Sequence, residues 1–431
     1  MPAANVLDIN LAAIERNLRA VGTFIGPETG ICPIVKADAY GLGLRRLGPR
    51  LQAAGADMFA VYDPDEAATL FDSGVGRPAL VLMPVTSIGR SDPLYRALIR
   101  DRLHLTLHDQ HHLRNLLRLA EHFGITIPVH LEVDTGMCRG GADPEDVPPL
   151  LEALHQTHRL RLAGIFTHFS EAERDDDRTR HQLARFDALL EDAAPRIPSD
   201  CLVHVANTAA MLRGRDFARS MVRVGLAWAG YGTELYTHAE HPVPADPGLQ
   251  PALTWTSTIV HTRTIPADTP VGYGSRWTSR RPTTLGLVPV GYADGFPAAC
   301  ADLGRGNDAR VGIRLADHAP IHHVPVVGAI SMDQLTVDLT DIVERTGRHH
   351  ADLRAATVEL VSPDPDAPNH LPRLAAAAGI RIHQFLCGLG PRANRRYLAH
   401  QPADAAPPAP DVLRLPTPTD ADPAPLRRAT V

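Results

Sequence analysis

Cysteine is scarce in this sequence, and its spacing does not suit crosslinking or metal binding. The 431 residues include five widely separated cysteines with no CxxC pair: Cys32, Cys138, Cys201, Cys300 and Cys387. An odd, scattered set is not the pattern of a disulfide framework, and the missing pairs speak against a structural zinc site. We therefore expect a protein of a reducing compartment, with the cytoplasm as its location.

Basic clusters, long apolar runs and a secretion signal are also missing. The formal net charge is -6, and the arginines are scattered, which speaks against nucleic acid or an anionic membrane as a partner. No apolar run is long enough to span a bilayer. The start, MPAANVLDIN, has neither the basic nor the apolar region of a signal peptide. With 44% hydrophobic residues, the chain can bury a sizeable core.

Eight short apolar runs alternate with amphipathic stretches in the first half of the chain. The runs are CPIVK (32–36), MFAVYD (58–63), PALVLMPV (78–85), LHLTLHD (103–109), PVHLEVDTG (128–136), AGIFTHF (163–169), LVHVAN (202–207) and VRVGLAWAG (222–230). The segments between them have helical periodicity and capping residues. Eight strand–helix units in roughly 200 residues predict a TIM (β/α)8 barrel, which typically takes ~250 residues. A doubly wound sheet usually has fewer strands and ranks second.

The composition changes near residue 240. The later chain has β-branched runs broken by Gly, Pro and Asp, which predict a mostly β domain over 241–400 with one helix at 371–379. The barrel would occupy 1–240, although its first few residues could join the β domain. Residues 401–431 are rich in Pro, Ala and Asp, and we predict that they form a disordered tail.

Candidate functional residues, most of them polar, stand at or near the ends of five of the predicted barrel strands. They are Lys36 and Tyr40; Asp134, Met137 and Arg139; His168; Asn207 and Thr208; and Arg223 and Gly225. The carboxyl ends of barrel strands meet at one rim, where the active sites of this fold lie. Each residue alone has a structural explanation, as a rim charge, a helix cap or a packing side chain. Convergence from five strands favours a functional site.

The types of these residues suggest a phosphorylated cofactor. Asn207 and Thr208 stand at a predicted helix start, and Gly225 allows a backbone amide to approach closely; such groups bind anions. A lysine at a strand end, such as Lys36, is a candidate for a Schiff base. Phosphate and Schiff base together suggest pyridoxal phosphate. The histidine clusters, such as HDQHH at 108–112, have no acidic motif nearby, so we predict no metal site.

Together, these motifs resemble the alanine racemases, the fold type III pyridoxal phosphate enzymes. The matching stretches, which run in order from about residue 5 to 400, are PIVKADAYGLG, VHLEVDTGMCRGG, GIFTHFS, ANTAA, MVRVGLA, VGYGSRWT, VPVGYADGFP and ISMDQLTVDLT. The resemblance implies a homodimer with shared active sites. It also implies interconversion of L-alanine and D-alanine, which supplies D-alanine for peptidoglycan.

The resemblance also implies roles for individual residues. Lys36 would hold the cofactor and act as one catalytic base, and Tyr273 of the partner subunit would be the opposite base. The cofactor phosphate would be held by Tyr40, Thr208 and the amides of Gly225 and Leu226, with Asn207 beside them. The pyridine ring of the cofactor would contact His168, and its nitrogen would face Arg223. Arg139 would contact the cofactor's phenolic oxygen and the substrate carboxylate, and Tyr292 and Met332 would line the substrate pocket. A guanidinium effectively never deprotonates, so Arg223 would leave the ring nitrogen unprotonated and weaken the electron sink, which suits a racemase.

Several positions depart from the family pattern. Glu132 stands where many members have a lysine whose carbamylated form steers Arg139, and we expect the glutamate to supply that negative charge without modification. The remaining departures lie at a glycine-rich turn, near the substrate entrance and around the catalytic tyrosine: Leu42, Ala229, Ala329, Ser331 and His383. They keep open a racemase with the same chemistry and another substrate, such as serine or a basic amino acid.

Two further alternatives are weaker. A decarboxylase of the same fold type would place an acidic residue, not Arg223, at the pyridine nitrogen; a D-threonine aldolase belongs to this same group of alternatives. A non-enzymatic cofactor-binding protein of the single-barrel kind would lack the β domain, which this sequence has and which carries Tyr273.

Overall fold

The chain forms two compact units. The computed structural model describes residues 5–90, 92–174, 176–236, 246–301 and 309–399. Among the described residues, the barrel unit comprises Ile14–Ala39 and Gly43–Leu249, and the β unit comprises residues 5–13, Tyr40–Leu42 and residues 250–399. The expected boundary at 240/241 and the expected tail at 401–431 lie outside the described residues.

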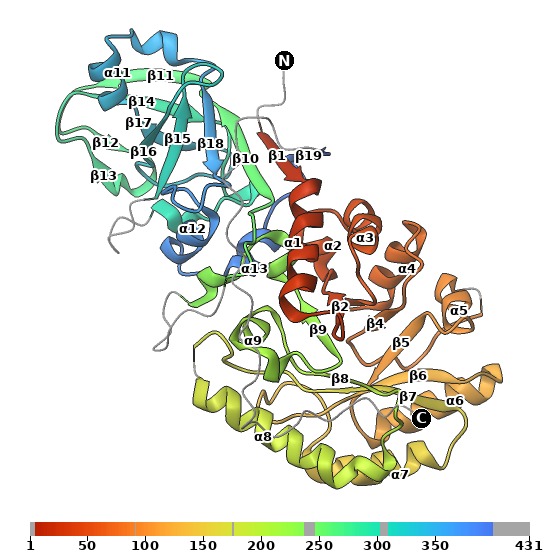
Figure 1. Cartoon of the computed structure of the whole chain (residues 1–431). Coiled ribbons are helices and arrows are strands. Elements are labelled where there is room, and N and C mark those ends of the chain that lie inside the picture. Colours follow the sequence, from red (N-terminus) through yellow and green to blue (C-terminus); the bar gives the residue numbers. More distant parts are fainter. Residues whose placement is uncertain (1–4, 91, 175, 237–245, 302–308, 400–431) are drawn as a thin grey trace. The chain divides into compact units, whose positions relative to one another are not determined.

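The barrel unit is built on eight parallel strands (Figure 1). They are β2 (Gly30–Pro33), β3 (Phe59–Val61), β4 (Ala79–Val81), β5 (Leu103–Leu107), β6 (Ile127–Glu132), β7 (Leu160–Phe166), β8 (Leu202–His204) and β9 (Met221–Val224). Strands β3 to β8 form one sheet in chain order, and β2 pairs with β9. Backbone hydrogen bonds close the ring, from Val35 N to Ala60 O (2.9 Å) and from Arg223 N to Ala206 O (2.9 Å). The TIM barrel is confirmed.

The eighth apolar run is only partly a strand. Strand β9 ends at Val224, and Leu226–Ala229 form the short helix α10 instead. Both segments are buried, so an apolar run alone does not separate a strand from a buried helix. The other barrel helices cover the outside of the strands: α1 (Leu11–Ile25), α3 (Leu44–Ala53), α4 (Pro64–Asp72), α5 (Pro93–Leu98), α6 (Gln110–Phe123), α7 (Val147–His155), α8 (Asp176–Ala193) and α9 (Thr208–Arg213).

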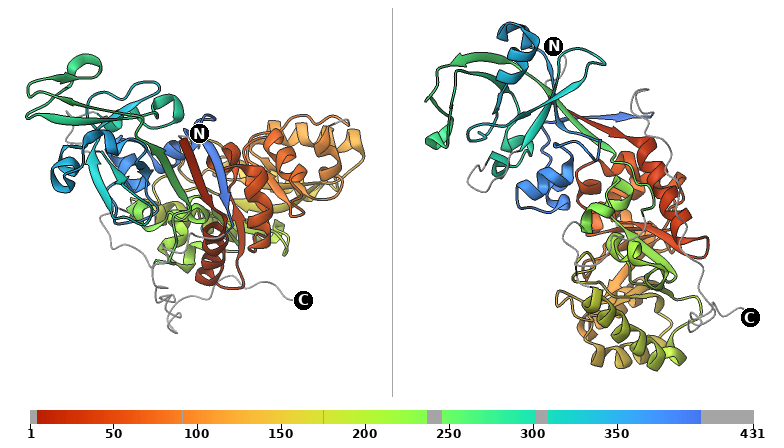
Figure 2. Two further views of the ribbon diagram at one scale, coloured as in Figure 1. Left: turned by 90° about the horizontal axis from the view of Figure 1, so that it is seen from above. Right: turned by 60° about the vertical axis from the view of Figure 1, so that its left-hand side comes forward.

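The β unit contains a six-stranded sheet in the order β16-β15-β18-β10-β1-β19. Its strands are β1 (Asn5–Asn10), β10 (Leu253–Thr258), β15 (Arg310–Arg314), β16 (Ile321–Pro325), β18 (Thr357–Val361) and β19 (Asn394–Leu398). The N-terminal β1 pairs antiparallel with β10 and parallel with β19, and Figure 2 shows these three strands side by side. The first strand of the chain thus belongs to the β unit.

Smaller sheets and three helices complete the β unit. Strands β11 (His261–Ile265), β14 (Thr283–Val288) and β17 (Leu335–Asp338) form one sheet, and β12 (Pro270–Val271) pairs with β13 (Trp277–Thr278). The helices are α11 (Thr340–Thr346), α12 (Leu371–Ala377), which confirms the helix expected at 371–379, and α13 (Ile382–Cys387). No helix in the described ranges has both the length and the apolar character needed to cross a membrane.

Candidate active site

Lys36 lies just beyond β2, at the carboxyl end of the barrel, and begins the short element α2 (Lys36–Tyr40). The next residues turn in the left-handed sense: Ala37, Asp38, Ala39 and Tyr40 have φ between 52° and 55°. A left-handed residue other than glycine costs ~1–2 kcal/mol. Four in succession beside a lysine make this segment a candidate functional site, because strain of this kind collects at active sites.

Two carboxylates stabilise this left-handed turn. Glu66 accepts a hydrogen bond from the Ala37 N–H (2.5 Å). Asp38 accepts the Leu44 N–H through its side chain (2.7 Å) and the Gly43 N–H through its carbonyl (2.9 Å). These bonds satisfy backbone N–H groups on both sides of the turn, which offsets part of its strain. They also fix the backbone from which the Lys36 side chain extends.

Arg223 is a buried cation in the barrel. It lies on β9 beside Cys32 of β2, and its side chain donates to the carbonyls of Thr167 (2.7 Å) and His204 (2.7 Å). Burial lowers the pKa of Arg223 to about 10, and the nearby Cys32 and Glu132 oppose that shift. No carboxylate bonds to this guanidinium among the described residues. Its acceptors are neutral, which suits a donor facing a neutral ring nitrogen.

A row of buried histidines extends from Arg223 through the barrel. The Arg223 guanidinium lies 2.9 Å from His204 Nδ1. His204 Nε2 lies 2.9 Å from His130 Nδ1, and His130 Nε2 lies 2.9 Å from His104 Nδ1. We call these three residues the histidine row. A second guanidinium nitrogen of Arg223 lies 3.2 Å from His168 Nδ1, so the cation holds a histidine on each side.

Arg223 fixes the proton positions along the histidine row. A guanidinium only donates, so His204 Nδ1 accepts and the His204 proton lies on Nε2. The same reasoning places the protons of His130 and His104 on Nε2, so every bond points away from Arg223. Burial lowers the pKa of His104 to about 4 and the pKa values of His130 and His204 well below the usual value. All three are therefore neutral near pH 7.

Glycine makes room for the histidine row. Strands β6 and β8 are not neighbours, because β7 lies between them, yet His130 of β6 and His204 of β8 are hydrogen-bonded. The intervening residue is Gly164, where a Cβ would lie 2.2 Å from His130 Nδ1. The sequence interpretation missed these histidines. Their signal was a histidine at an interior position of each of three apolar runs.

The strand ends after β8 and β9 gather backbone amides. Asn207 caps α9, accepting the Ala210 N–H (2.9 Å), which confirms the expected helix start. Thr208 Oγ1 accepts the N–H groups of Gly225 (3.1 Å) and Ala227 (3.3 Å). The first turns of α9 and α10 therefore meet, with Leu226 between the two bonded amides. The starts of two helices thus lie side by side, a setting that favours an anion such as phosphate.

Glu132 ends β6 and contacts a histidine from the neighbouring strand. Its Oε2 lies 3.1 Å from Nδ1 of His108, the residue that follows β5, and both side chains are mostly buried. The turn carrying Arg139 packs against Glu132, since a Cβ on Gly141 would lie 2.9 Å from Glu132 Cγ. The described residues include no ion pair between Glu132 and Arg139. The sequence interpretation paired Glu132 with Arg139 and missed His108.

The β unit displays its candidate residues on its surface. The exposed fractions are 76% for Tyr273, 48% for Tyr292 and 53% for Met332. Tyr292 N donates to Ser331 O (3.1 Å), next to Met332, and a Cβ on Gly291 would lie 2.3 Å from the Met332 carbonyl. Gly291 thus allows the two loops to meet closely, which brings Tyr292 and Met332 together.

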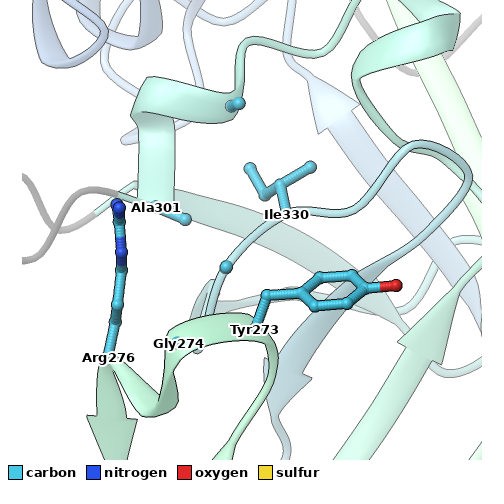
Figure 3. Close-up of a pocket in the computed structure, with 7 residues that line it drawn as sticks. Tyr273, Gly274, Arg276, Ala301 and Ile330 are labelled. Carbon is cyan, nitrogen blue, oxygen red and sulfur yellow. The ribbon is translucent and has the colours of Figure 1, made fainter.

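Gly272, the residue before Tyr273, lies close to Ala329, two residues before Ser331. A Cβ on Gly272 would lie 3.0 Å from the backbone N of Ala329. Beside it lies a pocket of about 290 Å³, lined by Tyr273, Gly274, Arg276, Ala298, Ala301, Ala329 and Ile330. Figure 3 shows Tyr273 and Arg276 projecting from one segment in different directions, with Ile330 and Ala301 nearby. Ala329, a departure from the family pattern, therefore lines this pocket.

Tyr40 belongs to the β unit and is buried. Its ring meets that of His383 edge-on, with centroids 5.5 Å apart and an interplanar angle of 81°. Burial raises the pKa of Tyr40. Leu42, another departure from the family pattern, is also buried, and its carbonyl accepts a hydrogen bond from Tyr397 (3.0 Å). His383 therefore packs directly on a predicted phosphate ligand.

Family models and known relatives match this chain along nearly its whole length. The family models described as "Alanine racemase, N-terminal domain" and "Alanine racemase, C-terminal domain" match residues 9–233 and 252–397. The alanine racemase of Lactobacillus delbrueckii subsp. bulgaricus is 32% identical over 400 residues, which cover 92% of this chain and 97% of that protein. Alanine racemase 2 of Oceanobacillus iheyensis is 31% identical, with 92% and 94% covered.

Solved structures show the same similarity. Alanine racemase from Streptomyces coelicolor gives a TM-score of 0.78 at 28% identity, covering 93% of this chain and 99% of that one. The alanine racemase of Bartonella henselae, solved with covalently bound pyridoxal phosphate, gives a TM-score of 0.74 at 27% identity, covering 92% and 100%.

Proposed function

Because the chain belongs to the alanine racemase family, whose members are isomerases, we propose that it interconverts L-alanine and D-alanine with pyridoxal phosphate held on Lys36. The observation that carries the proposal is the position of Lys36. It follows a buried strand, β2, that pairs directly with β9, the strand of Arg223. We further propose that the product D-alanine serves peptidoglycan synthesis in the cytoplasm.

The residues present fit this cofactor. Thr208 and the amides around Gly225 and Leu226 would take the phosphate, with Asn207 capping the helix there. Arg223, which has only neutral acceptors, would donate to the pyridine nitrogen, and His168, bonded to Arg223, would lie at the ring. When bound, the cofactor disperses the negative charge that develops at the substrate Cα. Tyr40, which is buried, would also reach the phosphate.

Racemisation needs one group to remove a proton from Cα and another to return one on the opposite face. We assign these roles to Lys36 and to Tyr273 of the partner subunit. Arg139 would hold the substrate carboxylate, and Tyr292 and Met332 would line the substrate pocket. The side chains of Tyr273, Tyr292 and Met332 are exposed on the β unit. This exposure supports their use by a second copy of the chain.

Lys36→Ala tests the lysine directly. The wild-type protein, incubated with the cofactor, should show the absorbance band of a lysine-bound pyridoxal phosphate and should exchange the alanine Cα proton in heavy water. Lys36→Ala should lose both. A variant that kept both would rule out this assignment.

Mixing of two inactive variants tests the shared site. Lys36→Ala and Tyr273→Phe should each be nearly inactive. After subunit exchange, half of the dimers should be hybrids with one intact site, which restores about a quarter of wild-type activity. Restoration would fail if both bases came from one chain.

A broader substrate range is the second candidate, because Ala329 lines the pocket beside Tyr273. An alanine leaves space that a longer side chain would fill. Racemisation rates over a panel that includes L-serine, L-lysine and L-arginine separate the two candidates. A preference for alanine of tenfold or more, on the order of 1.4 kcal/mol, would exclude the second.

A further inference from the structure

We propose that Arg392 is a positioning residue that aligns the two loops carrying Tyr292 and Met332, and thereby sets how tightly the substrate is held. Under the proposed function, on which this inference rests, these two side chains line the substrate pocket. Arg392 lies just before β19, outside the stretches in which the candidate site residues were found. Its guanidinium bonds to a carboxylate on each loop.

The two loops run side by side in register. The backbone bond donated by Tyr292 is followed by a second bond, from Ala293 N to Met332 O (3.0 Å). The next residue on each loop is an aspartate, Asp294 on one and Asp333 on the other. Two negative charges at this third position repel each other. The alignment that the backbone bonds begin therefore needs a cation at its end.

Arg392 supplies this cation and bridges the two aspartates. Its Nε and one terminal nitrogen donate to the two carboxylate oxygens of Asp294 (2.9 Å each), and its other terminal nitrogen donates to Asp333 (2.6 Å). The planar guanidinium presents its N–H groups in a fixed fork, which suits bidentate pairing. A lysine ammonium has no such fork. The bridge thus fixes both the distance and the direction between the two carboxylates.

Asp294 is the anchored end of the bridge. It is 1% exposed, and its carboxylate also accepts the side-chain N–H of Asn5 (3.0 Å) and the backbone N–H of Gly291 (2.9 Å). Asn5 in turn accepts the indole N–H of Trp255 (2.7 Å), a fully buried residue of β10. This carboxylate is therefore fixed to the six-stranded sheet of the β unit.

Asp333 is the end that the bridge restrains. Its side chain is 59% exposed, and Met332 before it is 53% exposed. Exposed side chains contribute little packing, so the position of this loop depends on its hydrogen bonds. The guanidinium of Arg392 carries the fixed position of Asp294 over to Asp333, directly beside Met332. Arg392 therefore holds this loop where the proposed substrate pocket needs it.

The test compares variants of the holoenzyme that break the bridge at either end. Asp333→Asn removes the exposed carboxylate, and Asp333→Glu keeps it. In Arg392→Lys, the ammonium should stay with buried Asp294, because an unpaired buried carboxylate is the costlier outcome, and Asp333 should lose its partner. Asp341→Asn, which breaks the exposed ion pair with Arg281, is the control.

Breaking the bridge should weaken substrate binding and little else. We expect Asp333→Asn and Arg392→Lys each to raise KM for L-alanine and Ki for propionate, a carboxylate without an amino group, by about fivefold. We expect kcat to change less than about twofold, because a loss of binding alone leaves turnover in place. The urea midpoint of Asp333→Asn should stay at the wild-type value. Asp333→Glu should recover most of the affinity, and the control should keep the wild-type KM.

A double variant separates positioning through the bridge from a direct effect of Asp333. In the Arg392→Lys background, Asp333→Asn should add nothing, because the link is already broken. Fully additive defects, equal defects in the Asn and Glu variants, or unchanged KM and Ki in an active Asp333→Asn enzyme would overturn the inference. Should Arg392→Lys not fold, the comparison of Asp333→Asn with Asp333→Glu still decides. A wild-type protein without racemase activity would overturn the proposed function, and with it the role assigned to Arg392.

Discussion

The barrel unit and the β unit hold their candidate functional residues in opposite ways. In the barrel unit, Arg223 is 3% exposed and bonded to histidines and carbonyls. In the β unit, Tyr273 is 76% exposed and projects beside an open pocket. The barrel side of the proposed site is preorganised at a cost in desolvation. Under the proposed function, a second copy of the chain would complete the β-unit side.

The β unit also buries charge, but for structural purposes. Asp294 is 1% exposed, and its carboxylate accepts two hydrogen bonds from Arg392 (2.9 Å each) and one from Asn5 (3.0 Å). Its own backbone N–H donates to Gly291 O (3.1 Å) and closes the turn that carries Tyr292. A buried charge in this unit shapes a loop, whereas the buried charge of the barrel unit faces the proposed chemistry. The comparison predicts unequal responses to mutation.

Gly164→Ala should have the largest effect. The added Cβ would lie 2.2 Å from His130 Nδ1, which forces the histidine row or the β7 backbone to move. We expect a loss of about 4 kcal/mol in the free energy of unfolding, above the usual range for overpacking, measured by urea denaturation. Gly76→Ala is the matched control, since its nearest heavy atom would be 3.6 Å away. A Gly164→Ala protein as stable as the control would show that the row is not rigid.

Arg223→Met should come next. Methionine fills part of the volume but leaves His204 Nδ1 and the Thr167 carbonyl without their donor. Unsatisfied buried acceptors cost ~1–3 kcal/mol each, so we expect a loss of about 3 kcal/mol. The measurement is again urea denaturation, without added cofactor. A loss below about 0.5 kcal/mol would contradict the idea that Arg223 organises the barrel interior.

Acid should weaken the barrel unit through its neutral histidines. The pKa of His104 falls from 6.5 to about 4 on folding, so the unfolded chain binds more protons between these values. The free energy of unfolding should therefore fall as pH drops through this window, by about 2 kcal/mol from His104 at pH 4.5. The urea midpoint measured from pH 7 to 4.5 tests this. His104→Gln should flatten the dependence by about one proton, and the exposed-site variant His111→Gln should leave it unchanged.

Tyr273→Phe should have the smallest effect on stability. The side chain is mostly exposed, so we expect a change below about 0.5 kcal/mol in the free energy of unfolding. Racemase activity should nevertheless fall by about a hundredfold or more, because general acid–base groups contribute at least that much. Coupled assays of D-alanine formation and urea denaturation on the same preparation make the comparison. A large stability loss would mean that Tyr273 supports the fold as well.

The sequence predicted the barrel because eight apolar runs with helical spacers constrain the topology strongly. It did not predict where each run stops being a strand. After Val224, the buried residues 226–229 remain apolar but coil into a helix, and burial is the same in both states. The left-handed turn after Lys36 was also missed, because alanine and aspartate carry no signal for it comparable to glycine.

The sequence offered candidate site residues only where a motif lies within one segment. The rim residues follow strand ends, so the barrel topology indicates where they lie. The Glu132–His108 pair and the histidine row depend on contacts across strands, and their geometry follows from register. The sequence interpretation found no acidic partner for HDQHH because Glu132 lies on the next strand and not beside it in sequence.

The left-handed turn limits which substitutions the segment after Lys36 tolerates. Positions 37 to 39 read Ala-Asp-Ala, and a β-branched side chain at any of them would clash with the backbone of its own turn. Glycine, asparagine or aspartate would fit the same backbone. This short segment should therefore accept only a few small residue types, while the helices around the barrel tolerate more substitutions. The handedness of one turn governs that restriction, whatever substrate the enzyme uses.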